Sequence, residues 1–145
     1  MIGLIQRVTE ARVEVDNRTV AQIDRGILAL IGVEKQDTSA TAERLAQRII
    51  QYRIFSDADG KMNLSLQDTS GELLLVPQFT LPADTRKGNR PSFSSAAPPE
   101  TGQRLFRELA DFAREAHGQA QTGVFGANMQ VSLTNDGPVT FWLQV

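Results

Sequence analysis

Apolar runs of strand length recur along the whole chain, and they constrain its fold more than any other feature. The runs that predict strands are residues 2–8, 11–15, 19–23, 27–33, 52–55, 72–79, 121–125, 128–133 and 139–145. Strict alternation of apolar and polar residues, as in 11–15, is typical of a strand with one buried face. The run 27–33 is almost continuously apolar, which indicates a central strand. Hairpin-like connections between the runs favour antiparallel pairing.

Two further segments predict amphipathic helices. In the first, the apolar residues fall at helical spacing and form one stripe: Ala42, Leu45, Ala46, Ile49 and Ile50. Asp37, Thr38 and Ser39 precede it as candidate N-caps. The second opens at Pro98-Pro99-Glu100 and ends before Gly118, a C-cap residue. Many strands with two helices predict an α+β domain with mostly antiparallel curved sheet and both helices packed on one side.

Length and composition predict one soluble domain that spans residues 1–145. A chain of 145 residues can bury a proper core. Its hydrophobic content of 41% and charged content of 22% are ordinary for a globular protein. No apolar stretch approaches the roughly 20 residues that cross a membrane, and the opening residues do not resemble a signal peptide. We therefore expect no membrane contact, and the absence of cysteine makes a cytoplasmic location the default expectation.

The chain lacks the usual catalytic side chains. It has no cysteine, which excludes disulfides, thiolate metal sites and a cysteine nucleophile. Its single histidine, His117, lies at the end of the second predicted helix, where it can interact with the helix C-terminus. A Ser-His-Asp triad would need this residue as its base, and a zinc hydrolase would need more imidazoles. We expect no metal and no organic cofactor.

Two short polar segments interrupt the strand pattern. Asn135-Asp136-Gly137-Pro138-Val139-Thr140 breaks an apolar run that begins at Met129. Proline cannot donate to a strand ladder and glycine weakens a strand, so a hairpin turn is the ordinary explanation. Gln78-Phe79-Thr80-Leu81 ends another apolar run. A strand end with a buried Phe79 explains the phenylalanine but leaves its two polar neighbours unexplained.

Together these segments resemble the paired signature of the D-aminoacyl-tRNA deacylase family. That family carries a Ser-Gln-Phe-Thr segment and an Asn-x-Gly-Pro-x-Thr segment that face each other across a homodimer. The resemblance extends from Met1 to Val145. Other matching segments are Ile5-Gln6-Arg7-Val8, Tyr52-Arg53-Ile54-Phe55-Ser56-Asp57, Lys61-Met62-Asn63-Leu64, Arg90-Pro91-Ser92-Phe93-Ser94 and Asn128-Met129-Gln130-Val131. The resemblance implies curved sheets with helices packed outside them.

The family hydrolyses the ester between a D-amino acid, or glycine, and the terminal adenosine of a transfer RNA. The resemblance includes glycine mischarged on tRNA(Ala) among the substrates. It implies that Gln78, Phe79 and Thr80 form the catalytic segment, with backbone amides near Phe79 and Thr80 directed at the carbonyl oxygen. The adenosine 2′-hydroxyl is expected to help activate water. Thr80 is the obvious nucleophile, but no base is available to activate it.

The other half of the site is implied to come from the partner subunit. In the family the Gly137-Pro138 bond is cis, and its carbonyl oxygens bind the substrate ammonium and leave no space for an L side chain. Arg7 is expected to hold this segment, although a strand-exposed charge explains it equally well. Phe125 and Met129 are expected to line the adenine pocket, although core packing explains both nearly as well.

One position departs from the family. Pro77 stands where the family has serine, and proline removes both the hydroxyl and a backbone N–H. Because the rest of the signature stands, we expect this serine to be dispensable.

Two alternative functions remain, and two loops each have two interpretations. The chain could be a non-catalytic module that binds the 3′ end of tRNA, or it could edit L-amino acids like the related domain of some threonyl-tRNA synthetases. A net charge of −2 excludes a broad basic surface.

The loop Arg86-Lys87-Gly88-Asn89-Arg90 is either a contact for acceptor-stem phosphates or a solvated loop. Asp57-Ala58-Asp59-Gly60 resembles the start of a calcium loop, but without the required glutamate we expect a turn.

Overall fold

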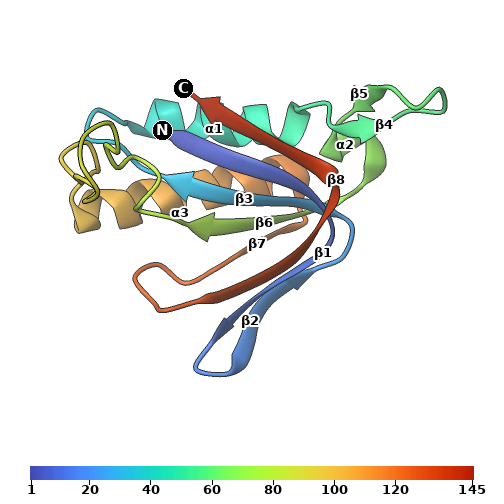
Figure 1. Cartoon of the computed structure of the whole chain (residues 1–145). Coiled ribbons are helices and arrows are strands. Elements are labelled where there is room, and N and C mark those ends of the chain that lie inside the picture. Colours follow the sequence, from blue (N-terminus) through green and yellow to red (C-terminus); the bar gives the residue numbers. More distant parts are fainter.

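A computed structural model describes residues 1–145 and shows a curved sheet with helices on one face (Figure 1). The strands are β1 (Ile2–Val15), β2 (Arg18–Ile23), β3 (Gly26–Gly32), β4 (Phe55–Ser56), β5 (Met62–Leu64), β6 (Glu72–Pro77), β7 (Ala120–Thr122) and β8 (Gln130–Gln144). The helices are α1 (Ser39–Gln51), α2 (Leu66–Thr69) and α3 (Pro99–His117). This arrangement confirms the predicted α+β class.

The main sheet is antiparallel around β1 and parallel at its other side. Its order is β2-β1-β3-β6-β7, and β8 pairs with β1 along the opposite edge. The first half of β1 pairs with β3 and the second half with β2, because β1 is long enough to bend across both. β3, β6 and β7 are parallel to one another. Parallel neighbours end at the same edge of a sheet, so the segments that follow β3 and β6 lie close together.

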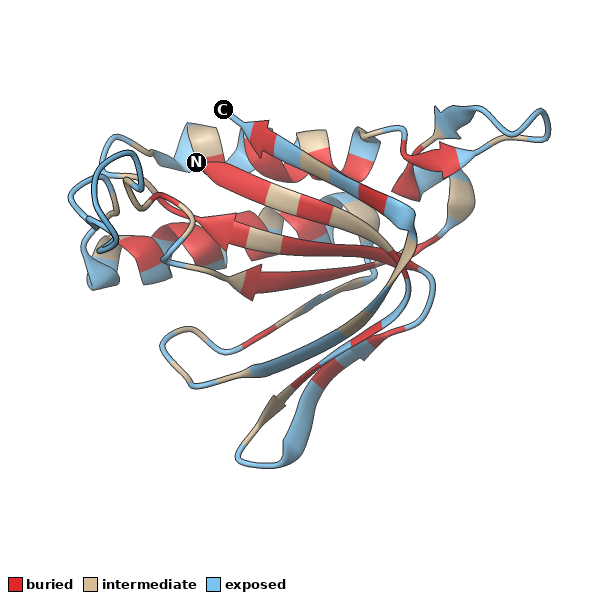
Figure 2. Ribbon diagram, viewed as in Figure 1, coloured by how far each residue is buried: buried red, intermediate tan, exposed pale blue.

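The principal core lies between the sheet and the two long helices. The predicted stripe of α1, from Ala42 to Ile50, is buried, and α3 buries its own apolar face beside it. Thr38 caps α1 by accepting a hydrogen bond from the Thr41 amide, as the candidate caps predicted. Gly118 ends α3 in the left-handed conformation with φ 79°. Figure 2 shows buried residues concentrated where the sheet faces these helices.

A smaller buried cluster lies on the other face of the sheet, under its bend. It joins the second half of β1 and β2 to the middle of the sheet and consists of Val8, Ala11, Val13, Ala21, Ile23, Leu28, Leu74 and Val76. The remainder of that face stays open. It carries Trp142, whose side chain is 51% exposed, and the half-buried Leu4 and Leu30.

The structure corrects several predicted elements. Residues 2–8 and 11–15 form the single strand β1, and the two runs after Met129 form the single strand β8. The strand predicted at 121–125 is β7, which ends at Thr122. The two predicted amphipathic helices are α1 and α3, and the structure adds a third helix, the four-residue α2. Four residues are too few for a helical periodicity, although the Ser65–Asp68 capping box was a readable signal. No helix combines the length and apolarity required to cross a membrane.

Candidate active site

The Gly-Pro pair lies in a bulge of β8. The strands β1 and β8 pair at Gln6–Thr140 and again at Val8–Asn135. The four residues of β8 between these pairs therefore face Arg7 alone. The bond between Gly137 and its proline is cis, and the strand continues on both sides. The hairpin-turn explanation of this segment was wrong.

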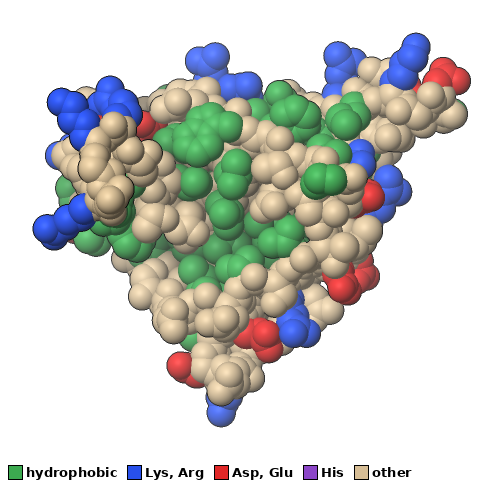
Figure 3. Space-filling view, in the orientation of Figure 1, with side chains coloured by type: hydrophobic (Ala, Val, Ile, Leu, Met, Phe, Trp, Pro, Cys, Tyr) green, Lys and Arg blue, Asp and Glu red, His purple; other side chains and the backbone are tan.

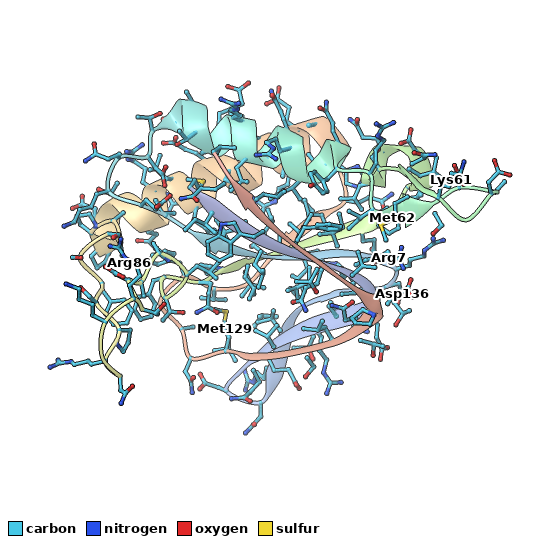
Figure 4. All side chains as sticks on the ribbon, turned by 45° about the horizontal axis from the view of Figure 1, so that its top comes forward. Arg7, Lys61, Met62, Arg86, Met129 and Asp136 are labelled. Carbon is cyan, nitrogen blue, oxygen red and sulfur yellow. The ribbon has the colours of Figure 1, made fainter.

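Arg7 ties this bulge to the segment after α1. Its Nε donates to the main-chain oxygen of Asp136 over 3.0 Å, and its Nη1 donates to the main-chain oxygen of Ile54 over 2.8 Å. The Asp136 carboxylate adds an ion pair at 3.3 Å. The Arg7 side chain is only 12% exposed, so a strand-exposed charge does not describe it. Figure 4 shows Arg7 and Asp136 side by side at the bend of β8.

Asn135 spans the bulge with its side-chain amide. Its Oδ1 accepts a hydrogen bond from the Val139 amide at 2.7 Å, and its Nδ2 donates to the Thr140 hydroxyl at 2.8 Å. A Cβ at Gly137 would come within 2.6 Å of a Val139 methyl, so only glycine fits there. Sequence reasoning missed this role of Asn135. The spacing of the asparagine and threonine around Gly-Pro was the signal.

Gln78, Phe79 and Thr80 form a turn directly after β6. The Gln78 amide donates to Ile31 on β3 at 2.7 Å, and the Leu81 amide closes the turn on the Gln78 carbonyl at 3.2 Å. The amides of Phe79 and Thr80, the two central residues, donate no hydrogen bond. Two adjacent free N–H groups in a turn can bind an anionic oxygen.

The side chains of this turn are accessible. Phe79 is 64% exposed, so the alternative of a buried strand-end phenylalanine was wrong. Its ring packs against Phe93, with 5.4 Å between the ring centroids. The Thr80 hydroxyl accepts a hydrogen bond from the Gln78 side-chain amide at 2.6 Å and contacts no acid or base that could activate it.

An apolar pocket adjoins the turn. Its volume is ≈ 460 Å³, within the range of small-molecule sites, and its walls are mostly hydrophobic. It brings together four of the predicted site residues, namely Gln78, Phe79, Phe125 and Met129. The Met129 sulfur accepts a hydrogen bond from the Val124 amide at 3.3 Å, which fixes the loop between β7 and β8. The Gly-Pro pair does not line this pocket.

Pro77 also lines the pocket, at the end of β6. The pairing between β6 and β7 stops at Leu75–Thr122. The Gln78 amide donates to Ile31 on β3, so the nitrogen of Pro77 faces the opposite side, where β7 no longer pairs with β6, and such a position tolerates proline. A Cβ at Gly123 would be in ordinary contact with the Pro77 ring at 3.5 Å but only 2.9 Å from the Met129 sulfur, so the glycine makes room for Met129.

Within one chain, the two signature segments lie far apart. Pro77 is level with Ile31 and Gly3 in the sheet, whereas the Gly-Pro bulge is level with Arg7. The bulge and the turn are thus separated by about 14 Å across three strand spacings and by about 13 Å along the strands. Figure 1 shows the bend of β8 and the end of β6 at opposite sides of the molecule.

The basic loop follows the turn and is held by an ion pair. Arg86 donates from Nε and Nη2 to the two carboxylate oxygens of Asp84, at 2.9 and 2.7 Å. These hydrogen bonds hold the pKa of Asp84 well below its usual range. Lys87 and Arg90 make no ion pair. Phe93, which contacts Phe79, follows the loop closely, so the loop borders the turn.

The remaining candidates lie outside the site. The ring Nε2 of His117 is 2.6 Å from the Gly71 oxygen, so this histidine links the end of α3 to the start of β6. Asp57 accepts hydrogen bonds from the amides of Asp59 and Lys61 at 2.9 Å each, which makes this segment a turn. No group of three or more His, Cys, Asp or Glu side chains could hold a metal ion.

Comparisons with known proteins agree on one family. The family model described as D-Tyr-tRNA(Tyr) deacylase matches residues 4–144. A protein of Francisella tularensis subsp. tularensis (strain WY96-3418) named "D-aminoacyl-tRNA deacylase" is 58% identical over 145 residues, 100% of both chains. One of Teredinibacter turnerae with the same name is 62% identical over 141 residues, 97% of each chain.

A solved structure extends the likeness to three dimensions. It is described as "c-Myc DNA Unwinding Element Binding Protein" and superposes with a TM-score of 0.95 and 37% identity, over 100% of this chain and 99% of the other. The fold, the two signature segments and these matches lead to one assignment. The chain belongs to the D-Tyr-tRNA(Tyr) deacylase family.

Proposed function

We propose that this protein hydrolyses the ester of D-aminoacyl-tRNA and releases the D-amino acid and the tRNA. The observation that carries this proposal is the pair of free amides at Phe79 and Thr80 beside an apolar pocket. An aminoacyl ester is already an activated carbonyl, so preorganised donors for the oxyanion supply the main requirement of its hydrolysis. The names of the relatives support the same substrate.

The terminal adenosine occupies the pocket in this proposal. Its adenine packs between Phe125 and Met129, and the Gln78 side chain holds the nucleotide. The ester carbonyl oxygen then points at the amides of Phe79 and Thr80. Water, assisted by the adenosine 2′-hydroxyl, bonds to the carbonyl carbon. The bond from this carbon to the 3′ oxygen then breaks, and a proton of the attacking water passes to that oxygen.

The same proposal makes the protein a homodimer with both active sites at the interface. The Gly137-Pro138 pair is exposed and too distant from the turn of its own chain, so the partner would supply it. The open face of the sheet offers a surface for a second copy. Trp142, Leu4 and Leu30 lie side by side there on three paired strands, and Figure 3 shows apolar side chains gathered on this face. Exposed apolar patches mark interaction surfaces.

Selection in this arrangement works by exclusion. The partner's carbonyl oxygens bind the substrate ammonium and leave no space for a side chain of L configuration. A D side chain points outward, and glycine has none, so D-aminoacyl-tRNA and glycyl-tRNA, including glycine mischarged on tRNA(Ala), are both accepted. We place this activity in the cytoplasm and assign it to one domain, residues 1–145.

The test follows loss of ester from D-tyrosyl-, glycyl- and L-tyrosyl-tRNA with the purified protein. We expect hydrolysis of the first two only. Binding of all three without hydrolysis would instead support a non-catalytic module for the tRNA 3′ end, and hydrolysis of the L ester would support an L-editing enzyme. The Thr80→Ala variant serves as a mechanistic control. It should keep substantial activity, because the proposed chemistry uses the amide of residue 80 and not its hydroxyl.

A further inference from the structure

The apolar pocket continues into a second depression on the flank of α3. Phe106 and Phe125 line both cavities, and their ring centroids are 6.4 Å apart. The second cavity has a volume of ≈ 180 Å³. Unlike the first, it is mainly polar and basic; its other lining residues are Gln103, Arg107, Ala110, Arg114 and Thr122. A ligand that fills the apolar pocket can therefore extend over the two phenylalanines into a basic site.

The basic side chains form a stripe along α3. Arg107 and Arg114 lie seven residues apart on one face of the helix, so they are separated by about 10 Å along its axis. Arg107 is exposed and makes no ion pair. Arg114 contacts Asp111 at 3.0 Å and the Thr122 hydroxyl at 3.4 Å. We call Arg107 and Arg114 the α3 arginine stripe.

The direction of the nucleic acid follows from the chemistry of its end. Under the proposed function, the 2′,3′ edge of the terminal ribose faces the amides of Phe79 and Thr80. The 5′ carbon lies on the opposite side of the sugar, so the phosphate attached to it leaves the pocket away from Phe79. Phe106 and Phe125 are shared by the pocket and the basic cavity that the α3 arginine stripe lines, whereas Phe79 lines the pocket alone.

We propose that the α3 arginine stripe binds the phosphates of the unpaired nucleotides immediately 5′ of the terminal adenosine. This inference rests on the proposed function and adds a path for the RNA. Guanidinium groups match phosphate geometry and carry a permanent charge. Aromatic rings next to a basic track are the usual design of single-strand binding sites, and the half-buried Phe125 supplies such a ring. The basic loop at 86–90 lies on the ester side of the pocket and is left out of this path.

The experiment compares two substrates that differ only in these phosphates. They are D-tyrosyl-tRNA and 3′-O-(D-tyrosyl)adenosine, which has no 5′ phosphate. The test variant is Arg107→Glu, and the matched control is Arg44→Glu, an exposed arginine of α1 without an ion pair. Arg107→Glu should raise KM for the tRNA on the order of tenfold and leave hydrolysis of the adenosine ester unchanged. It should also reduce the salt dependence of tRNA binding by about 0.7 in the log–log slope.

Three results would overturn the inference. Arg107→Glu could behave like Arg44→Glu on the tRNA, it could impair both substrates equally, or Lys87→Glu could show the tRNA-specific loss in its place. The affinity for uncharged tRNA, measured in parallel, separates this inference from the proposed function. If the wild-type protein hydrolyses neither ester, the proposed function fails, and the effect of Arg107→Glu on tRNA affinity still decides whether the stripe binds RNA.

Discussion

The guanidinium of Arg7 on β1 donates a 3.0 Å hydrogen bond to the main-chain oxygen of Asp136, the residue that precedes the Gly-Pro pair. The same guanidinium also donates to the main-chain oxygen of Ile54, so one side chain links the bulge of β8 to the segment after α1. Gly137 and Pro138 of the bulge are exposed. Arg7 therefore acts as a positioning residue in the proposed site and does not need to touch the substrate.

Replacing Arg7 with lysine should loosen the bulge. An ammonium is a single point charge and cannot reproduce two directed hydrogen bonds to separate carbonyls. We expect a loss of about 1–3 kcal/mol in the free energy of unfolding. The ratio of D-tyrosyl- to L-tyrosyl-tRNA hydrolysis should fall as well. Arg12→Lys on the same strand is the control, because Arg12 is 53% exposed. Equal effects of the two variants would contradict this role of Arg7.

Asn135 offers a second way to disturb the bulge. Asn135→Ala leaves the amide of the buried Val139 without an acceptor, which should cost about 1–3 kcal/mol of stability. Thr140→Val removes only the other hydrogen bond of the asparagine and should cost less. Urea unfolding gives the stabilities, and hydrolysis of L-tyrosyl-tRNA gives the loss of discrimination. A Thr140→Val variant as unstable and as unselective as Asn135→Ala would show that the amide of residue 139 is not the critical partner.

The free amide of Phe79 can be removed without a change of turn. Phe79 is the second residue of the turn from Gln78 to Leu81, a position that proline favours. Phe79→Pro removes the ring and the N–H, whereas Phe79→Ala removes the ring alone. If the amide binds the oxyanion, kcat of the proline variant should be about 10²–10³ below that of the alanine variant. Equal kcat values in the two folded variants would exclude this amide from the chemistry.

The ion pair of Asp84 and Arg86 should hold the basic loop over a wide pH range. Its hydrogen bonds to Arg86 lower the pKa of Asp84 from an ordinary value of 3.8. A carboxylate with a lowered pKa contributes its stabilisation in full above the unfolded value and loses it as the pH falls through the folded value. The NMR signals of the Arg86 amide and Nε–H should thus stay constant from about pH 8 to about pH 4 and move only below. In Asp84→Asn these signals should lack that low-pH transition.

The sequence predicted the fold class and the long helices because their signals are local. The stripe of α1 and the proline and glycine that bound α3 depend on residues within a few turns of one another. Strand continuity was harder. β1 and β8 each bend, and their pairing across the bulge depends on contacts 129 residues apart, such as Arg7 with Asp136. A period-two pattern cannot distinguish a bulge from a turn, so Gly-Pro was read as a break between strands.

In the candidate site, too, local sequence signals were predicted and features that depend on distant contacts were not. Composition excluded a cysteine nucleophile and argued against a Ser-His-Asp triad or a zinc site. The resemblance then identified the turn at Gln78 and the Gly-Pro pair as the candidate site. The pocket that joins Phe125 and Met129 to this turn depends on the parallel order of β3, β6 and β7, which the sequence did not predict. The bonds of Asn135 were also missed, because a side chain that spans its own bulge leaves no periodic trace.

The bulge of β8 is held by pairing with β1 before and after it along the strand, which limits how substitutions can change selectivity. On the proposed reading, the discriminating atoms belong to the main chain, which every amino acid shares. No exchange of a single side chain could convert such a filter to the opposite chirality; it could only weaken it. An engineer who wants hydrolysis of L esters would have to re-register two strands. Single substitutions in evolution meet the same limit, so they can weaken the preference for D esters more easily than they can reverse it.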